Sequence, residues 1–148
     1  MWRVYLKLWD RMMASKVSIK NIMTSRIISV DEGEKVCDAV KKMTERNIES
    51  IVVKKNNEFV GILTEKDIME KINSVNIYSP DLTVRQIMSS PLITIDANAP
   101  IGDATKIMVA KNISRLLVEE NDKIVGIISQ KDVNRETLNV YMVLSSAI

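Results

Sequence analysis

The sequence contains no histidine and a single cysteine, Cys37, among its 148 residues. Without histidine, neither a Ser-His-Asp nor a Cys-His catalytic arrangement is available, and a zinc site would lack its usual ligands. A single cysteine forms no disulfide within the chain, which is typical of the reducing cytoplasm. At its place in a helical segment, we expect Cys37 to be a small packed residue and not a reactive thiol. These absences favour a cytoplasmic protein that is not an enzyme and has no obligatory cofactor.

A strong charge of either sign and a high aromatic content are also missing. Lys and Arg together number 21 and Asp and Glu 19, a net charge of +2, and aromatic residues make up 4%. Nucleic-acid binding needs cationic backbone contacts and stacking platforms, so this composition argues against it. No apolar run approaches the roughly 20 residues that span a bilayer. The sequence therefore predicts neither nucleic acid nor membrane as a partner.

The first residues, "MWRVYLKLWDRMMASK", are amphipathic. Charged residues interrupt any signal-peptide core, while one helical face gathers Trp2, Tyr5, Trp9, Met12 and Met13. We expect a helix that docks on a partner or on the body of the protein. A membrane-surface helix and an extension with little order are the alternatives.

The rest of the chain is a duplication with an offset of 65 positions. Residues 18–67 align without a gap on residues 83–132, and 18 of the 50 aligned pairs are identical. Self-similarity of this kind indicates two supersecondary blocks, neither of which buries its apolar face alone. We expect the two copies to pack with pseudo-twofold symmetry.

Each copy predicts the order helix–strand–helix–strand–strand–helix, and therefore an α/β fold. The first helices begin after Ser18 and Thr83, both good N-caps, and the second helices end at Asn47 and Asn112. A hairpin and a last helix follow. We divide the chain into an N-terminal extension (1–15), a first repeat (16–73), a linker (74–82) and a second repeat with a helical tail (83–148).

One motif recurs at the end of each hairpin: "GILTEKD", Gly61 to Asp67, and "GIISQKD", Gly126 to Asp132. A hydroxyl followed three residues later by an acid can be a capping box, which stabilises any helix start. A capping box prefers the longer Glu or Gln, however, and both copies have Asp. A carboxylate can accept hydrogen bonds from ribose hydroxyls, and a helix N-terminus favours phosphate. The glycines allow either a close backbone approach or a β-bulge.

These motifs resemble those of CBS domains, the regulatory modules named for cystathionine β-synthase. The resemblance covers about residues 17–137 and rests on "IMTSRIISVD", "NIESIVV" and "GILTEKD" in the first copy. In the second copy it rests on "IMSSPLITID", "NISRLLV" and "GIISQKD". It implies a tandem pair of repeats whose two clefts bind adenosine derivatives: AMP, ADP, ATP and, in some members, S-adenosylmethionine or NAD. The motif Asp then holds the ribose, and the Ser or Thr reaches phosphate.

The resemblance also implies that each cleft takes this motif from one repeat and the early strands from the other. The first cleft would combine Ile62, Thr64, Asp67, Ser90, Pro91, Leu92, Ile113, Ser114 and Arg115. The second would combine Ser25, Arg26, Ile27, Ile48, Glu49, Ser50, Ile127, Ser129 and Asp132.

The two predicted clefts are unequal in charge. Arg115 in the first can bind phosphate oxygens through two bonds, although an exposed charge at a strand end is the alternative interpretation. Its counterpart in the second cleft is Ser50, beside the acidic Glu49, which opposes a polyphosphate. We therefore expect the first cleft to bind a phosphate-bearing ligand more tightly.

The function that follows is a non-catalytic sensor, in which an adenine nucleotide shifts a packing equilibrium that a partner detects. We expect a homodimer and an effector protein that the sequence does not identify. The alternative is a structural or protein-interaction module with empty clefts that acts through its N-terminal helix.

Overall fold

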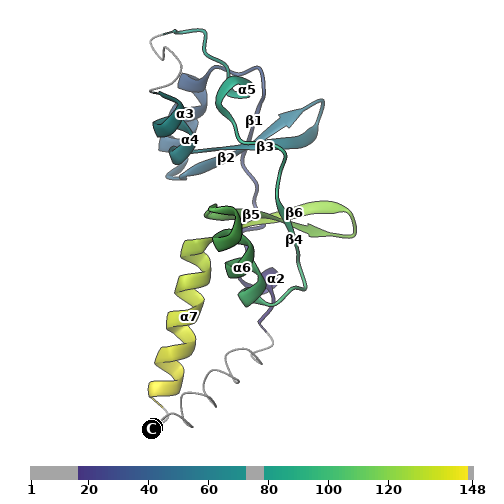
Figure 1. The fold of residues 1–148 in the computed structure, drawn as a ribbon, viewed down its shortest axis with the longest axis vertical. Coiled ribbons are helices and arrows are strands. Elements are labelled where there is room, and N and C mark those ends of the chain that lie inside the picture. Colours follow the sequence, from purple (N-terminus) through teal and green to yellow (C-terminus); the bar gives the residue numbers. More distant parts are fainter. Residues whose placement is uncertain (1–16, 73–78, 147–148) are drawn as a thin grey trace. The chain divides into compact units, whose positions relative to one another are not determined.

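The computed structural model describes residues 17–72 and 79–146, which form two compact units (Figure 1). Of these residues, unit 1 contains 17–26 and 93–146, and unit 2 contains 27–72 and 79–92. The compact units therefore differ from the sequence repeats, because the two repeats exchange their first segments. The short first helix of each repeat folds with the strands of the other repeat.

Unit 2 is built on a three-stranded sheet in the order β1-β2-β3. The strands are β1 (Ser29–Asp31), β2 (Ser50–Lys55) and β3 (Glu58–Thr64). The first pair is parallel and the second antiparallel. Helices α3 (Val36–Arg46), α4 (Glu65–Ile72) and α5 (Val84–Ile87) lie on one face of this sheet (Figure 1).

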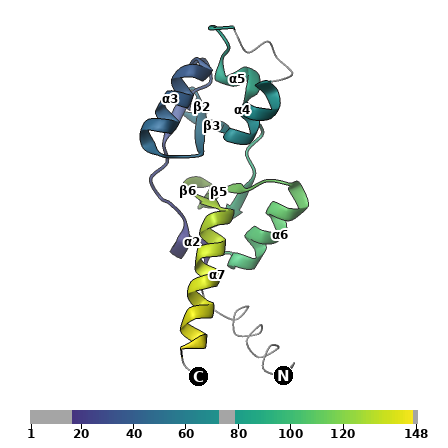
Figure 2. The ribbon, with the colours of Figure 1, turned by 90° about the vertical axis from the view of Figure 1, so that its left-hand side faces the viewer.

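Unit 1 repeats this arrangement with the order β4-β5-β6. Its strands are β4 (Thr94–Asp96), β5 (Arg115–Glu120) and β6 (Lys123–Ser129). Its helices are α2 (Ile19–Ile22), α6 (Ile101–Lys111) and α7 (Gln130–Ser145). Figure 2 shows α7 running beyond α6 and α2 within this unit. The α/β class and the element order of each repeat are confirmed.

The local signals behave as predicted at the caps and turns. Ser18 and Thr83 cap α2 and α5, and each is part of a capping box. Asn47 and Asn112 end α3 and α6 in the left-handed conformation, with φ of 52° and 51°. The two-residue hairpin turns, Asn56–Asn57 and Asn121–Asp122, also have positive φ, as the twist of a tight hairpin requires.

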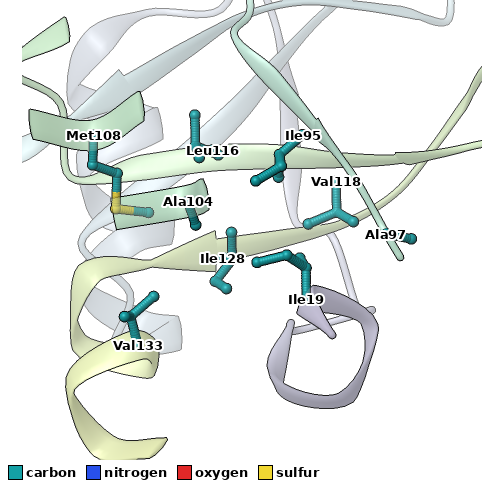
Figure 3. Packing of buried hydrophobic residues seen from close by; sticks show 9 residues of the cluster. All are labelled: Ile19, Ile95, Ala97, Ala104, Met108, Leu116, Val118, Ile128 and Val133. Carbon is teal, nitrogen blue, oxygen red and sulfur yellow. The ribbon is translucent and has the colours of Figure 1, made fainter. Parts of the chain in front are cut away.

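Each unit has its own apolar core between the sheet and the helices. In unit 1 the core comprises Ile19, Ile95, Ala97, Ala104, Met108, Leu116, Val118, Ile128 and Val133 (Figure 3). In unit 2 it comprises Val30, Ala39, Met43, Ile51, Val53, Leu63, Leu82, Val84 and Ile87. The helix from each exchanged segment thus supplies buried side chains to its sheet.

The expectation for Cys37 is wrong, because this residue is exposed. Ala39 and Met43 occupy the buried face of α3, and Cys37 lies outside that stripe. The prediction of a docking helix concerns residues 1–15, which lie outside the described part of the chain.

Candidate functional site

In unit 2 the repeated motif joins the end of β3 to the start of α4. The amide and hydroxyl of Thr64 both donate to Asp67 Oδ2, at 2.9 and 2.7 Å, and the Asp67 amide donates to Thr64 Oγ1 at 3.1 Å. Asp67 is 7% exposed and is the one charged residue that is buried in the described part of the chain. Because a buried carboxylate is costly unless it is hydrogen-bonded, these contacts are needed to hold it there.

In unit 1 the second copy joins β6 to α7 in the same way. The amide and hydroxyl of Ser129 donate to Asp132 Oδ2 at 2.9 and 2.6 Å, and the Asp132 amide donates to Ser129 Oγ at 3.2 Å. The Asp132 side chain is 17% exposed, against 10% for Asp67. The duplicated sequence therefore builds the same hydrogen-bonded turn twice.

This geometry corrects the argument from side-chain length. In both copies aspartate Oδ2 reaches the amide of the capping residue at 2.9 Å, so Asp closes the box although Glu or Gln is the usual residue. Capping therefore accounts for the hydrogen bonds of one oxygen, Oδ2, in each carboxylate. An ionised carboxylate offers about four acceptor positions, which leaves the surroundings of Oδ1 to distinguish the two units.

In unit 2, Asp67 Oδ1 accepts a hydrogen bond from Ser89 Oγ at 2.6 Å. Lys71 Nζ lies 3.6 Å from the same oxygen and donates to the carbonyls of Ile87 and Met88 at 2.6 and 3.1 Å. The cation is thus held between the carboxylate on α4 and the end of α5. The network ties the motif aspartate to the exchanged segment.

In unit 1 the corresponding atoms are arranged differently. Arg135 Nη1 lies 3.6 Å from Asp132 Oδ1. The residue aligned with Ser89 is Thr24, whose hydroxyl makes no hydrogen bond to Asp132 among the residues described. The residue aligned with Lys71 is Glu136, an acid. The Oδ1 contacts of the two motif aspartates are therefore not conserved by the duplication.

Ser89 and Lys71 were not among the predicted site residues. A signal for Ser89 was present, because positions 24 and 89 both carry a hydroxyl directly after the repeated Met23 and Met88. No comparable signal existed for Lys71, since its aligned partner has the opposite charge.

The motif glycines lie where the exchanged segment crosses the last strand of each sheet. A Cβ on Gly61 would be 2.9 Å from Ser89 O, and one on Gly126 would be 3.0 Å from Thr24 O. The amides and carbonyls of Ile62 and Ser89 are mutually hydrogen-bonded at this crossing. The close approach at both glycines is that of the exchanged segment, and register shifts in both hairpins show that irregular pairing accompanies it.

The predicted residues divide between the units as follows. Unit 2 contains Ile62, Thr64, Asp67, Ser90, Pro91 and Leu92 of the first cleft. Unit 1 contains Ser25, Arg26, Ile127, Ser129 and Asp132 of the second cleft. The remaining residues belong to the opposite unit: Ile113, Ser114 and Arg115 to unit 1, and Ile27, Ile48, Glu49 and Ser50 to unit 2. The combination of both sets into one cleft stays a prediction.

Arg115 has a defined position within unit 1. It begins β5 and is the register partner of Ser129 on β6, and its Nη1 donates to Ser114 Oγ at 2.9 Å. Directly opposed residues of an antiparallel pair project to the same side of the sheet. The guanidinium thus belongs to the same side of its sheet as the second motif hydroxyl, a relation that the sequence alone did not predict.

Other classes of site find little support. Among residues 17–72 and 79–146, no group of three or more Cys, Asp or Glu side chains is placed to hold a metal ion. In the same ranges, no helix combines the length and apolar character needed to cross a bilayer.

The chain matches a family model described as CBS domain twice, at residues 19–74 and 84–139. Its relatives include an uncharacterized protein of Methanopyrus kandleri, 34% identical over 119 residues. That alignment covers 79% of this chain and 61% of the relative, so the relative has further sequence beyond the shared region.

Solved structures of similar fold include an uncharacterized conserved protein from Pyrococcus horikoshii. It is 33% identical with a TM-score of 0.72, covering 82% of this chain and 92% of that one. Another is the CBS domain pair of protein MJ0100 in complex with 5′-methylthioadenosine and S-adenosylmethionine. Its TM-score is 0.73 at 23% identity, covering 83% of this chain and 97% of that one.

Proposed function

Because the chain belongs to the CBS domain family, we propose that it is a non-catalytic regulatory module that binds adenosine-containing ligands. The candidate ligands are AMP, ADP, ATP, S-adenosylmethionine and NAD. The binding sites are the two predicted clefts, one containing Asp67 and the other Asp132. Ligand occupancy shifts a conformational equilibrium, which is the output of the module.

The observation that carries the proposal is the same carboxylate in the same turn of both units. Oδ2 of each aspartate is used by its cap, and Oδ1 has partners that a ligand hydroxyl can replace or supplement. Two vicinal ribose hydroxyls are donors of suitable geometry for one carboxylate. The adenosine ligands of the MJ0100 domain pair support the ligand class, and the residue assignment rests on the motifs of this chain.

Calorimetric titration of the full chain with AMP, ATP, S-adenosylmethionine and NAD tests the proposal. At least one ligand should bind, and at 100 times its Kd it should raise the free energy of unfolding by about 2.7 kcal/mol. The substitutions Asp67→Asn and Asp132→Asn should each weaken one site by about 10- to 100-fold, the value of a charge-assisted hydrogen bond.

Asp38→Asn is the matched control. Asp38 is also an aspartate that recurs in the second repeat, at Asp103, but it is exposed on α3 and away from the motif. It should leave every affinity unchanged. If none of the four ligands binds, the proposal is wrong. If all three variants bind with equal affinity, the site assignment is wrong.

We also propose that the output passes through association, because the chain has no predicted catalytic group through which to act. A homodimer in the cytoplasm that contacts an effector protein is the expected form. Light scattering with and without ligand measures this step separately from binding.

A further inference from the structure

The exchanged segment of unit 2, residues 79–92, is attached to the candidate site through a lysine. Helices α4 and α5 are in contact and lie side by side in Figure 2. Lys71, in the last turn of α4, donates to the carbonyls of Ile87 and Met88 at the end of α5. The same ammonium lies 3.6 Å from Asp67 Oδ1. Lys71 therefore connects the motif carboxylate to the end of α5.

A serine attaches the segment to the same carboxylate oxygen. Ser89 Oγ donates to Asp67 Oδ1 at 2.6 Å. Beside this contact, the Ile62 amide donates to Ser89 O at 3.0 Å and the Ser89 amide donates to Ile62 O at 2.8 Å. Three residues later, after Leu92, the chain leaves unit 2 for unit 1. The segment that joins the two units is thus held by a carboxylate of the candidate site.

Unit 1 has the same backbone crossing with different side chains around it. The Thr24 amide donates to Ile127 O at 2.9 Å, and the Ile127 amide donates to Thr24 O at 3.0 Å. The Thr24 hydroxyl makes no hydrogen bond to Asp132 in the described part of the chain. Glu136 replaces Lys71, and a carboxylate cannot donate to a helix carbonyl. Neither side-chain attachment is therefore repeated at the aligned position.

The number of acceptor positions on Asp67 decides what a ribose must displace. Each carboxylate oxygen accepts about two hydrogen bonds. Asp67 Oδ2 already accepts two from Thr64, and Oδ1 accepts one from Ser89. One ligand hydroxyl can therefore bind Oδ1 beside Ser89, whereas two vicinal hydroxyls must replace the Ser89 hydroxyl. At Asp132 no hydroxyl of the described residues has to leave Oδ1.

We propose that Ser89 is a latch, which holds the exchanged segment to Asp67 in the ligand-free protein and is released by a ribose with two free hydroxyls. Lys71 is the positioning residue that keeps the end of α5 beside the carboxylate. The release step rests on the proposed function, whereas the latch itself does not. Occupancy of the Asp67 site, and not of the Asp132 site, then loosens the segment that joins the two units.

Hydrogen exchange followed by NMR tests the latch in the ligand-free chain. The amides of Ile62 and Ser89 should be protected about tenfold more than those of Ile127 and Thr24, the effect of one net hydrogen bond. Ser89→Ala should remove this difference at the Ile62 amide. The Val52 amide, which donates to a carbonyl within the sheet of unit 2, is the reference for a general loss of stability and should not change.

Lys71→Met tests the positioning role, because it keeps the aliphatic stem and removes the ammonium. It should lower the protection of the Ile62 and Ser89 amides by about tenfold, and Lys71→Arg, which keeps a cationic donor, should restore most of it. Lys66→Met is the matched control. Lys66 is also on α4, but it is half-exposed and lies 3.7 Å from Glu70 on the same helix, so its loss should change neither amide.

AMP and 2′-deoxy-AMP test the release, because they differ only in one ribose hydroxyl. Saturating AMP should lower the protection of the Ile62 and Ser89 amides, relative to Val52, by about tenfold. Saturating 2′-deoxy-AMP should leave it unchanged, since its single hydroxyl binds beside Ser89. In the Ser89→Ala variant, AMP should cause no further loss at Ile62.

Equal protection of the two crossings in the ligand-free chain would overturn the latch. The same effect from AMP and 2′-deoxy-AMP, with both bound, would overturn the release step. If neither nucleotide binds, the proposed function is wrong for nucleotides and the release step fails with it. The ligand-free comparison then still decides whether Ser89 and Lys71 hold the segment.

Discussion

The two units share a motif and differ in what surrounds it. In unit 2 the motif aspartate accepts a hydrogen bond from Ser89 and lies beside Lys71, whereas in unit 1 the aligned positions are Thr24 and Glu136, and Arg135 supplies the nearby cation. The carboxylate in unit 2 is the less exposed of the two. A duplicated sequence motif thus specifies a turn, while the neighbours decide how available the carboxylate is to a ligand.

This difference bears on the order of affinities predicted from the sequence, which stays a prediction. Arg115 favoured the cleft of Asp67, yet Asp67 Oδ1 already has a short hydrogen bond that a ribose hydroxyl would have to replace. Arg115 is also the register partner of Ser129, in the unit of Asp132.

The largest expected effect is on stability. Asp67→Ala removes a cap and leaves the Ser89 hydroxyl without its acceptor, so it should lower the free energy of unfolding by about 2–4 kcal/mol. Asp132→Ala removes a cap and the ion pair with the exposed Arg135, which contributes little, and should cost about 1 kcal/mol. Urea unfolding of both variants measures the difference, and equal losses would show that the Ser89 bond adds nothing.

A smaller effect is expected on ligand affinity. If the Ser89 hydroxyl competes with a ligand for Asp67, Ser89→Ala should tighten binding at that cleft by up to about tenfold, the net value of one hydrogen bond. Thr24→Ala, at the aligned position of unit 1, is the control and should change affinity by less than a factor of about two, because no hydrogen bond to Asp132 is lost. Weaker binding by Ser89→Ala would mean that Ser89 itself contacts the ligand.

The smallest effect is expected on the pH dependence of stability, through the pKa of Lys35, whose counterpart in the second repeat is Pro100. The hydrogen bond and charge of Asp81, at 3.1 Å, raise the pKa of the Lys35 ammonium above its usual value. A raised pKa adds stability that is present at neutral pH and is lost as the pH rises through the folded-state pKa. Asp81→Asn should return the pKa toward its usual value, as followed by NMR titration; an unchanged pKa would show that the exposed pair does not form in solution.

Much of the fold could be predicted because its signals are local. Ser18 and Thr83 cap helices, Asn47 and Asn112 end them, and paired Asn or Asp residues make the hairpins. Each of these residues acts on backbone groups within a few positions of itself, so the chain around it contains the whole explanation.

The exchange of segments and the Ser89–Asp67 contact could not be predicted in the same way. Both depend on which of two similar sheets a short helix joins, and α2 and α5 carry equivalent apolar residues. The glycines indicate part of this arrangement, since Gly61 and Gly126 lack a Cβ at the points where Ser89 and Thr24 cross the strands. A close approach was foreseen there, but the sequence did not identify the segment that approaches.

The exchange also affects the order in which the protein can fold during synthesis. Unit 2 is continuous from residue 27 to residue 92, so it can fold as soon as that stretch leaves the ribosome. The core of unit 1 contains Ile19 near its start and Ile128 and Val133 near its end. Ile19 therefore cannot be buried until Ile128 and Val133 have been synthesised. At the usual rate of synthesis this delay over about a hundred residues is roughly 5 to 20 seconds. Throughout that time Ile19 has no sheet to join, so we expect unit 1 to be the part of the newborn chain most exposed to misfolding.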